Sequence, residues 1–179
     1  MIITVSGLAG TGTTSVCQRL KEILGYEYIY AGAIFREEAR KMDMPIEEFC
    51  HYLEENPQMD KTIDKKVIEF ARSYPNTILE GRLAGWMVHL DKLPALKVLL
   101  KVPLNISAKR VALRDLSTYE EAMDRVQKRD FRDQERYKKL YNVDLNDESI
   151  YDLIIDTSER TVEEEVALIM EYMNNYCNS

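Results

Sequence analysis

The feature that most constrains the fold is a glycine-rich segment near the start of the chain. Residues 7–14 are Gly-Leu-Ala-Gly-Thr-Gly-Thr-Thr, and they lie between a short apolar run, 2–5, and a stretch of helical periodicity. Apart from one position, the segment fits the phosphate-binding loop pattern G-x-x-x-x-G-K-[ST]. The glycines let backbone N–H groups turn inward around phosphate oxygens, and the following helix adds unpaired donors. We therefore expect phosphate groups to be bound by Gly7, Leu8, Ala9, Gly10, Thr11, Gly12, Thr13, Thr14 and Ser15.

Two threonines of this loop bear on its chemistry. Thr14 stands where the pattern places a hydroxyl ligand of Mg²⁺, so we expect it to contact that ion. Thr13 stands where the pattern has lysine, so another group must supply positive charge beside the phosphates. A glycine-rich turn that binds nothing is the alternative. Three glycines in six residues, placed between a strand and a helix, argue against that alternative.

The other apolar runs predict an α/β fold. Short apolar segments followed by helical periodicity are typical of buried parallel strands joined by crossover helices. Five segments have this character: 2–5, 77–80, 96–102, 151–156 and, more weakly, 26–30. We expect a single domain over residues 1–179, a three-layer α/β/α sandwich around a central five-stranded parallel sheet.

Two helical stretches, about 32–73 and about 105–141, interrupt the alternation of strand and helix. We expect both to be insertions at the carboxyl ends of strands, where open parallel sheets bind ligands. Helix starts are predicted at Pro57 and at two capping boxes, Ser117 with Glu120 and Thr161 with Glu164.

Charge and cysteine content limit the partners. The formal net charge is -7, which argues against a general nucleic-acid or membrane-surface binder. Cys17, Cys50 and Cys177 are far apart and lack metal-ligand spacing, which favours a reducing, cytoplasmic setting. We expect small-molecule partners, no nucleic acid, no membrane and a monomeric chain.

Cations are concentrated in one stretch of this acidic chain. Residues 109–139 hold ten basic and seven acidic residues, and Arg125, Arg129, Arg132 and Arg136 follow one another at spacings of four, three and four. These spacings put all four arginines on one narrow stripe of a helix, where they repel one another. Arginine forks match phosphate oxygens, so the stripe indicates phosphate chemistry. A solvated helix face with salt bridges remains the alternative.

A second candidate group lies at the end of a predicted strand. Glu80 could hold Mg²⁺ through water, Gly81 allows close approach of an acceptor, and Arg82 could clamp its phosphate. A Glu-Gly pair that only ends a strand is the alternative. Arg36, on the first turn of a predicted helix, could grip an acceptor phosphate or be a surface arginine.

These segments resemble cytidylate kinases of the archaeal type, within the nucleoside monophosphate kinase superfamily of P-loop NTPases. The resemblance runs nearly end to end. It rests on the loop at 7–14, Tyr30-Ala31-Gly32 with Phe35-Arg36, residues 80–86 (Glu-Gly-Arg-Leu-Ala-Gly-Trp) and residues 149–155 (Ser-Ile-Tyr-Asp-Leu-Ile-Ile). That family often has threonine at the position of Thr13. Residues 129–136 are also similar to the lid of bacterial cytidylate kinases.

The resemblance implies a kinase that transfers the γ-phosphoryl group of ATP to CMP or dCMP with Mg²⁺. Residues 32–73 would form the monophosphate-binding region and residues 105–141 the lid. Arg129, Arg132, Arg136 and Arg82 would be catalytic, Arg36, Arg82 and Gly81 would bind the monophosphate, and Asp133 would orient the lid arginines or contact the acceptor.

Several alternatives stay open. The acceptor could be another monophosphate such as UMP or AMP, and the chain could be a non-catalytic ATP-binding switch or a nucleic-acid-binding module. The base contacts do not carry over from the family. Asp60, Lys61, Asp64 and Lys65 have suitable chemistry for a cytosine, and they are equally compatible with exposed helix charges.

Overall fold

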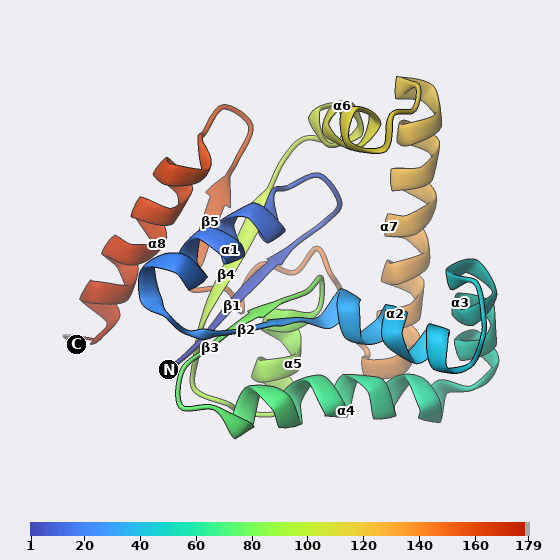
Figure 1. Cartoon of the computed structure of the whole chain (residues 1–179), viewed down its shortest axis with the longest axis horizontal. Coiled ribbons are helices and arrows are strands. Elements are labelled where there is room, and N and C mark those ends of the chain that lie inside the picture. The colour runs from blue at the N-terminus through green and yellow to red at the C-terminus, as the bar shows by residue number, and fades with distance from the viewer. Residues whose placement is uncertain (178–179) are drawn as a thin grey trace.

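The computed structural model describes residues 1–177 and has a parallel sheet at its centre (Figure 1). Five strands lie in the order β2-β3-β1-β4-β5, and every pair is parallel. This confirms the predicted five-stranded parallel α/β sheet. The strands are β1 (Ile2–Gly7), β2 (Glu27–Tyr30), β3 (Thr77–Glu80), β4 (Ala95–Lys101) and β5 (Leu153–Asp156).

Four strands differ from their predicted bounds: β2 begins one residue later, β4 lies one residue earlier at both ends, and β1 and β5 each differ by two residues at one end. β1 continues to Gly7, because it pairs with β4 as far as Leu100. β5 begins at Leu153 rather than at residue 151. Just before it, the Asp152 carboxylate accepts hydrogen bonds from the backbone N and the Nζ of Lys97, at 2.7 and 2.9 Å.

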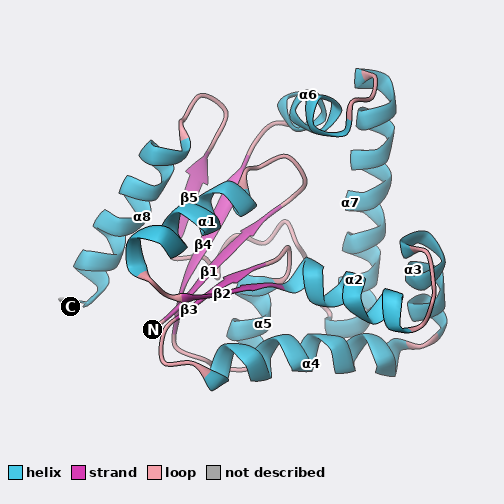
Figure 2. Ribbon diagram, viewed as in Figure 1, coloured by secondary structure: helices cyan, strands magenta, loops and turns pink. Residues whose placement is uncertain are grey.

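Helices cover both faces of the sheet (Figure 2). The alternation in β1 sends Ile3 and Val5 into a core shared with α1 (Thr13–Leu24) and α8 (Val162–Cys177). The opposite face packs, through Leu79 of β3, on α4 (Pro57–Ser73) and α5 (Ala84–Leu90). The expected three layers are therefore present, with the two cores on either side of the sheet.

The remaining helices stand beside the sheet rather than on it (Figure 1). α2 (Ala31–Lys41) and α3 (Ile46–Glu55) pack with α4 around a separate small core that contains Phe49 and Ile63. α6 (Leu104–Asp115) and the long α7 (Tyr119–Tyr141) follow β4. These helices fill the two stretches that interrupt the strand–helix alternation of the sequence.

The start of α7 corrects one sequence prediction. The capping box is Thr118 with Glu121, not Ser117 with Glu120: Thr118 Oγ1 accepts from Glu121 N at 3.2 Å, and Glu121 Oε2 accepts from Thr118 N at 3.0 Å. Ser117 is not the N-cap of α7, because it takes part in the end of α6. Leu116 follows that helix in a left-handed conformation (φ 52°), and Ser117 N donates to Ala112 O of α6.

The other two predicted helix starts are confirmed. Thr161 and Glu164 exchange cap hydrogen bonds at the start of α8, and Pro57 opens α4. Across residues 1–177, no helix combines the length and apolar character needed to cross a bilayer.

Candidate active site

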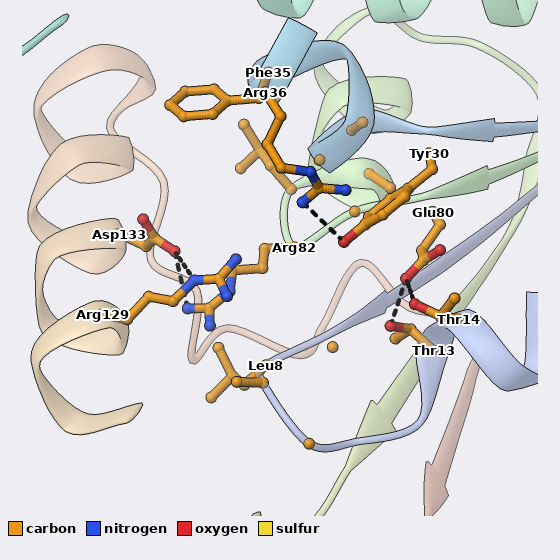
Figure 3. Close-up of a pocket in the computed structure, with 18 of the residues that line it drawn as sticks. Leu8, Thr13, Thr14, Tyr30, Phe35, Arg36, Glu80, Arg82, Arg129 and Asp133 are labelled. Carbon is orange, nitrogen blue, oxygen red and sulfur yellow. Dashed lines mark hydrogen bonds and ion pairs between the residues drawn. The ribbon is translucent and has the colours of Figure 1, made fainter. Parts of the chain in front are cut away.

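A cavity of about 600 Å³ opens at the carboxyl ends of the strands (Figure 3). Its walls come from the β1–α1 loop, the turn after β3 and the helices α2 to α7. The phosphate-binding loop and the two helical stretches singled out in the sequence therefore face one space. This is the place where an open parallel sheet binds ligands.

The glycine-rich loop has the backbone that its glycines predict. Gly10 and Gly12 adopt φ of 74° and 93°, a region that residues with a Cβ rarely enter. A Cβ on Gly10 would lie 2.8 Å from the carbonyl oxygen of Ser107 in α6. Every other member of the predicted set also lines the cavity except Thr11, whose side chain is buried (2% exposed) and donates to Leu8 O.

Three consecutive carbonyl groups of this loop are held by side chains that are distant in the sequence. Ala9 O accepts from Ser107 Oγ at 2.6 Å, Gly10 O from Arg110 Nη1 at 3.1 Å, and Thr11 O from Thr157 Oγ1 at 3.0 Å. Anchored carbonyls fix the orientation of the peptide units between them. The loop is therefore held in one shape before a ligand arrives, which lowers the entropic cost of binding.

Glu80 connects the loop to the neighbouring strand. Its Oε1 accepts from Thr13 Oγ1 at 2.8 Å and from Thr14 Oγ1 at 2.6 Å, and Tyr28 donates its hydroxyl to Oε2. Glu80 is 3% exposed, and burial together with this hydrogen bond raises the pKa of Tyr28. One carboxylate and two hydroxyls form an oxygen donor set, which is the kind of set that Mg²⁺ prefers.

Arg82, which was expected to bind an acceptor phosphate, follows β3 after Gly81. Its side chain is 8% exposed, and Nη1 lies 2.6 Å from Asp130 Oδ1 and 2.9 Å from Asp133 Oδ2, both on α7. Its Nη2 is buried without a hydrogen-bond partner among the residues that the structure describes. A buried guanidinium with a free donor at a cavity wall is suited to an anionic ligand.

Arg36 of α2 and Arg82 line the same cavity (Figure 3). The Arg36 guanidinium sits 4.9 Å from the centre of the Tyr30 ring, and its Nη1 is 3.5 Å from the Tyr30 hydroxyl. The cation is therefore supported by the face of an aromatic ring at the end of β2.

The four arginines of the α7 stripe separate into two groups. Arg129, Arg132 and Arg136 line the cavity, and Arg129 Nε lies 3.9 Å from Asp133. Arg125 does not line it; its guanidinium donates to Ser117 Oγ at 2.6 Å and pairs with Asp115. A 23-residue helix passes the cavity with only part of its length, so Arg125, one turn before Arg129, lies beyond the cavity's edge.

Arg136 is paired with a buried carboxylate of α4. Its Nε donates to Asp60 Oδ2 at 2.6 Å, Nη2 pairs with Asp60 Oδ1, and the guanidinium lies about 5 Å from the rings of Phe35 and Tyr137. Asp60 is 1% exposed, so this contact joins α4 firmly to α7.

Comparison with known proteins places this geometry in a family. Residues 2–159 match the model of the cytidylate kinase-like family. The cytidylate kinase of Pyrococcus furiosus is 48% identical over 159 residues, covering 89% of this chain and 81% of the relative. The chain belongs to the cytidylate kinase-like family. The cytidylate kinase of Methanocaldococcus jannaschii, 39% identical over 176 residues, covers 98% of both chains.

Solved structures agree with this fold. A protein from Eubacterium ventriosum superposes with a TM-score of 0.72 at 17% identity, covering 97% of this chain and 98% of that one. The shikimate kinase of Acinetobacter baumannii in complex with shikimate gives a TM-score of 0.62 at 19% identity, covering 98% and 93%. At these identities the likeness shows the P-loop kinase fold alone.

Several groups at the site of this family member had no clear signal in the sequence. Ser107, Thr157, Tyr28 and Asp130 act only through contacts with residues far along the chain. Arg110 of α6 lines the cavity as well, and it donates to Gly10 O and to Thr157 O.

A buried carboxylate behind the loop gives a testable pH dependence. Glu165 of α8 is 3% exposed, and burial raises its pKa to about 7, against the lowering effect of Arg110 and Arg160. A raised carboxyl pKa means that the folded state takes up the proton first, so this group lowers stability above pH 7 and ceases to do so as the pH falls.

We expect Glu165→Gln to raise the free energy of unfolding at pH 8 by on the order of 1 to 2 kcal/mol and to leave it little changed at pH 5. Urea unfolding at both pH values measures this, with the exposed Glu163→Gln as control. Parallel pH profiles for the Glu165→Gln variant and the wild type would contradict the assignment.

Proposed function

We propose that this protein transfers the γ-phosphoryl group of ATP to CMP, with dCMP as a second acceptor. The observation that supports it most is the single cavity that joins the phosphate-binding loop to Arg36, Arg82 and the α7 arginines. Membership of the cytidylate kinase-like family adds the acceptor class.

The loop residues Gly7 to Ser15 would bind the ATP phosphates through backbone N–H groups held inward by the anchored carbonyls. Thr14 and, through water, Glu80 would hold Mg²⁺, which when bound neutralises charge on the β- and γ-phosphate oxygens. The fit rests on the buried carboxylate between the two threonine hydroxyls.

Arg36 and Arg82 would hold the CMP phosphate in line with the γ-phosphate, with Gly81 allowing its close approach. Arg129 and Arg132 would act with Arg82 on the charge of the transferred group, and Asp133 would orient them. Arg136, expected among the catalytic arginines, would face the base of the acceptor instead, because Asp60 holds its Nε and Nη2. Closure of residues 105–141 over the cavity would exclude water, which otherwise accepts the phosphoryl group.

Thr13, which stands where the phosphate-binding loop pattern has lysine, is consistent with these roles. Thr13 donates to Glu80, so the position of the usual cation is used to hold the carboxylate beside Thr14. Arg110, Arg114 and Arg129 all line the cavity and are the cations that could approach the β- and γ-phosphates instead. The monomeric state, the cytoplasmic setting and the absence of nucleic-acid and membrane partners stay predictions.

The acceptor is tested by measuring ADP release from ATP and Mg²⁺ with CMP, dCMP, UMP, AMP and GMP in parallel. We expect CMP to be used at least tenfold faster than either purine nucleotide. Stimulation by UMP or AMP above CMP would move the assignment to another monophosphate kinase. A rate that no monophosphate changes would favour the ATP-binding switch.

A further inference from the structure

The cavity is lined by apolar side chains as well as by arginines. Its apolar part, which we call the far end, comprises Phe35 of α2, Ile63 and Val67 of α4 and Met87 of α5. An acceptor whose phosphate lies at Arg36 and Arg82 would place its base in this end. Apolar walls suit the faces of a planar base, so discrimination between bases depends on the few polar groups at its edge.

Asp64 is the carboxylate on the α4 wall of this end. It lies between Ile63 and Val67, is half-buried, and lines the cavity. Tyr141 of α7 donates its hydroxyl to Asp64 Oδ2 at 2.6 Å. The second oxygen, Oδ1, accepts no hydrogen bond from residues 1–177. Oδ1 is not among the buried side-chain atoms that lack a partner, so it is open to the cavity and can accept a hydrogen bond from a ligand.

The charge state of Asp64 fits such a role. Burial raises the pKa of Asp64 and Asp60 adds to the rise, while the Tyr141 hydrogen bond and Arg136 oppose it, and the net pKa is about 6. Asp64 is therefore mostly ionised above neutral pH while remaining half-buried. A hydrogen-bond donor from a ligand would be worth more here than at the surface.

Arg136 supplies the complementary group. Asp60 and Asp64 are one turn apart on α4, so the Asp60–Arg136 and Asp64–Tyr141 contacts lie side by side along α7. Asp60 takes up Nε and Nη2 of Arg136, while Nη1 donates to no residue in the part of the chain that the structure describes. The far end of the cavity thus offers one acceptor and one donor, each held rigidly by a second residue.

This pair matches the edge of cytosine. Cytosine presents an amino donor at position 4 and acceptors at N3 and O2, whereas uracil presents a carbonyl at position 4 and a donor at N3. Resting on the proposed function, we propose that Asp64 is the residue that selects the base: its Oδ1 accepts from the 4-amino group of CMP, and Arg136 Nη1 donates to the ring acceptors. Tyr141 and Asp60 are then positioning residues.

The test compares three acceptors that differ at the Watson–Crick edge of the ring: CMP, UMP and the 2-pyrimidinone nucleotide, which is CMP without its 4-amino group. UMP differs from CMP at position 4 and at N3, and the pyrimidinone nucleotide differs at position 4 alone. With the wild-type protein we expect kcat/KM to be about a hundredfold lower for the pyrimidinone nucleotide than for CMP, mainly through KM. UMP should be worse, because its O4 faces a carboxylate oxygen. Equal use of CMP and the pyrimidinone nucleotide by the wild type would overturn the proposal without any variant.

The Asp64→Asn variant completes a double-mutant cycle in which the other change is the loss of the 4-amino group of CMP. Asparagine keeps the size and can still accept from Tyr141, but its amide can turn a donor toward the base. We expect kcat/KM for CMP to fall at least thirtyfold, the value for UMP to stay or rise, and the pyrimidinone nucleotide to change less than fivefold. Non-additivity between the deleted amino group and the changed side chain is the signature of a direct contact. A purely structural role would lower all three acceptors together.

Two further variants separate direct recognition of the base by Asp64 from a structural role of this residue. Glu69→Gln changes an exposed carboxylate on the same helix, and it should leave all three rates unchanged. Tyr141→Phe removes only the positioning hydroxyl, and it should lower the CMP-to-UMP ratio three- to tenfold. An Asp64→Asn protein that keeps the wild-type ratio refutes the assignment of Asp64 while leaving the kinase intact. A wild type that uses none of the acceptors refutes the proposed function, and this inference with it.

Discussion

Replacing Arg82 with alanine is expected to lower kcat/KM for CMP about a thousandfold, equivalent to about 4 kcal/mol of transition-state stabilisation. The Arg82 side chain is 8% exposed, against 14% for Arg136 and 52% for Arg129, and its Nη2 has no partner among the described residues. Its loss removes a preorganised donor from the cavity wall. Steady-state kinetics with CMP varied at saturating ATP measures the effect.

The same change also leaves Asp130 without its cation and leaves Asp133 with the more distant Arg129 alone. Breaking a buried ion pair costs on the order of 3 kcal/mol in the free energy of unfolding, so unfolding curves must accompany the kinetics. ATP affinity, measured by titration calorimetry, should change less than threefold. Arg125→Ala is the matched control, because Arg125 belongs to the same helix stripe but lies outside the cavity. Equal losses for both variants, or activity of Arg82→Ala within tenfold of wild type, would contradict the role.

Glu80→Gln should lower kcat about a hundredfold and raise the Mg²⁺ concentration needed for half-maximal rate about tenfold. Glutamine keeps the shape and can still accept from Thr13 and Thr14, so the change isolates the charge. Binding of ATP without Mg²⁺ should be unchanged or tighter, because a negative charge near the phosphates is removed. Initial rates over a Mg²⁺ series check this prediction.

Tyr28→Phe is the control for Glu80. It removes one hydrogen bond to the carboxylate but leaves the charge, so we expect less than a tenfold loss of kcat and no change in the Mg²⁺ requirement. If Glu80→Gln shows the same Mg²⁺ dependence as the wild type, Glu80 serves only to hold the threonines.

The fold was predictable because its signals are local. The glycine loop, the buried strands and the helix start at Thr161 each depend on residues within a few positions of one another. The start of α7 was missed by one residue because Ser117–Glu120 and Thr118–Glu121 both fit the capping pattern. The choice depends on the left-handed turn at Leu116, which the pattern does not contain.

The site was predictable in part. Sequence spacing put Arg129, Arg132 and Arg136 on one face, and these three line the cavity. It could not show that Asp60 takes up most of Arg136, since that contact joins residues 76 positions apart. The carbonyl contacts from Ser107 and Thr157 span 98 and 146 positions, so only the folded chain brings them to the loop.

The most direct test of the central claim follows the phosphoryl group itself. ATP labelled in its γ-phosphate is incubated with CMP, Mg²⁺ and the protein, and the products are separated by anion-exchange chromatography. The proposed function predicts that the label appears in CDP in an amount equal to the ADP formed. Label that stays in ATP, or that appears only as inorganic phosphate, would contradict it.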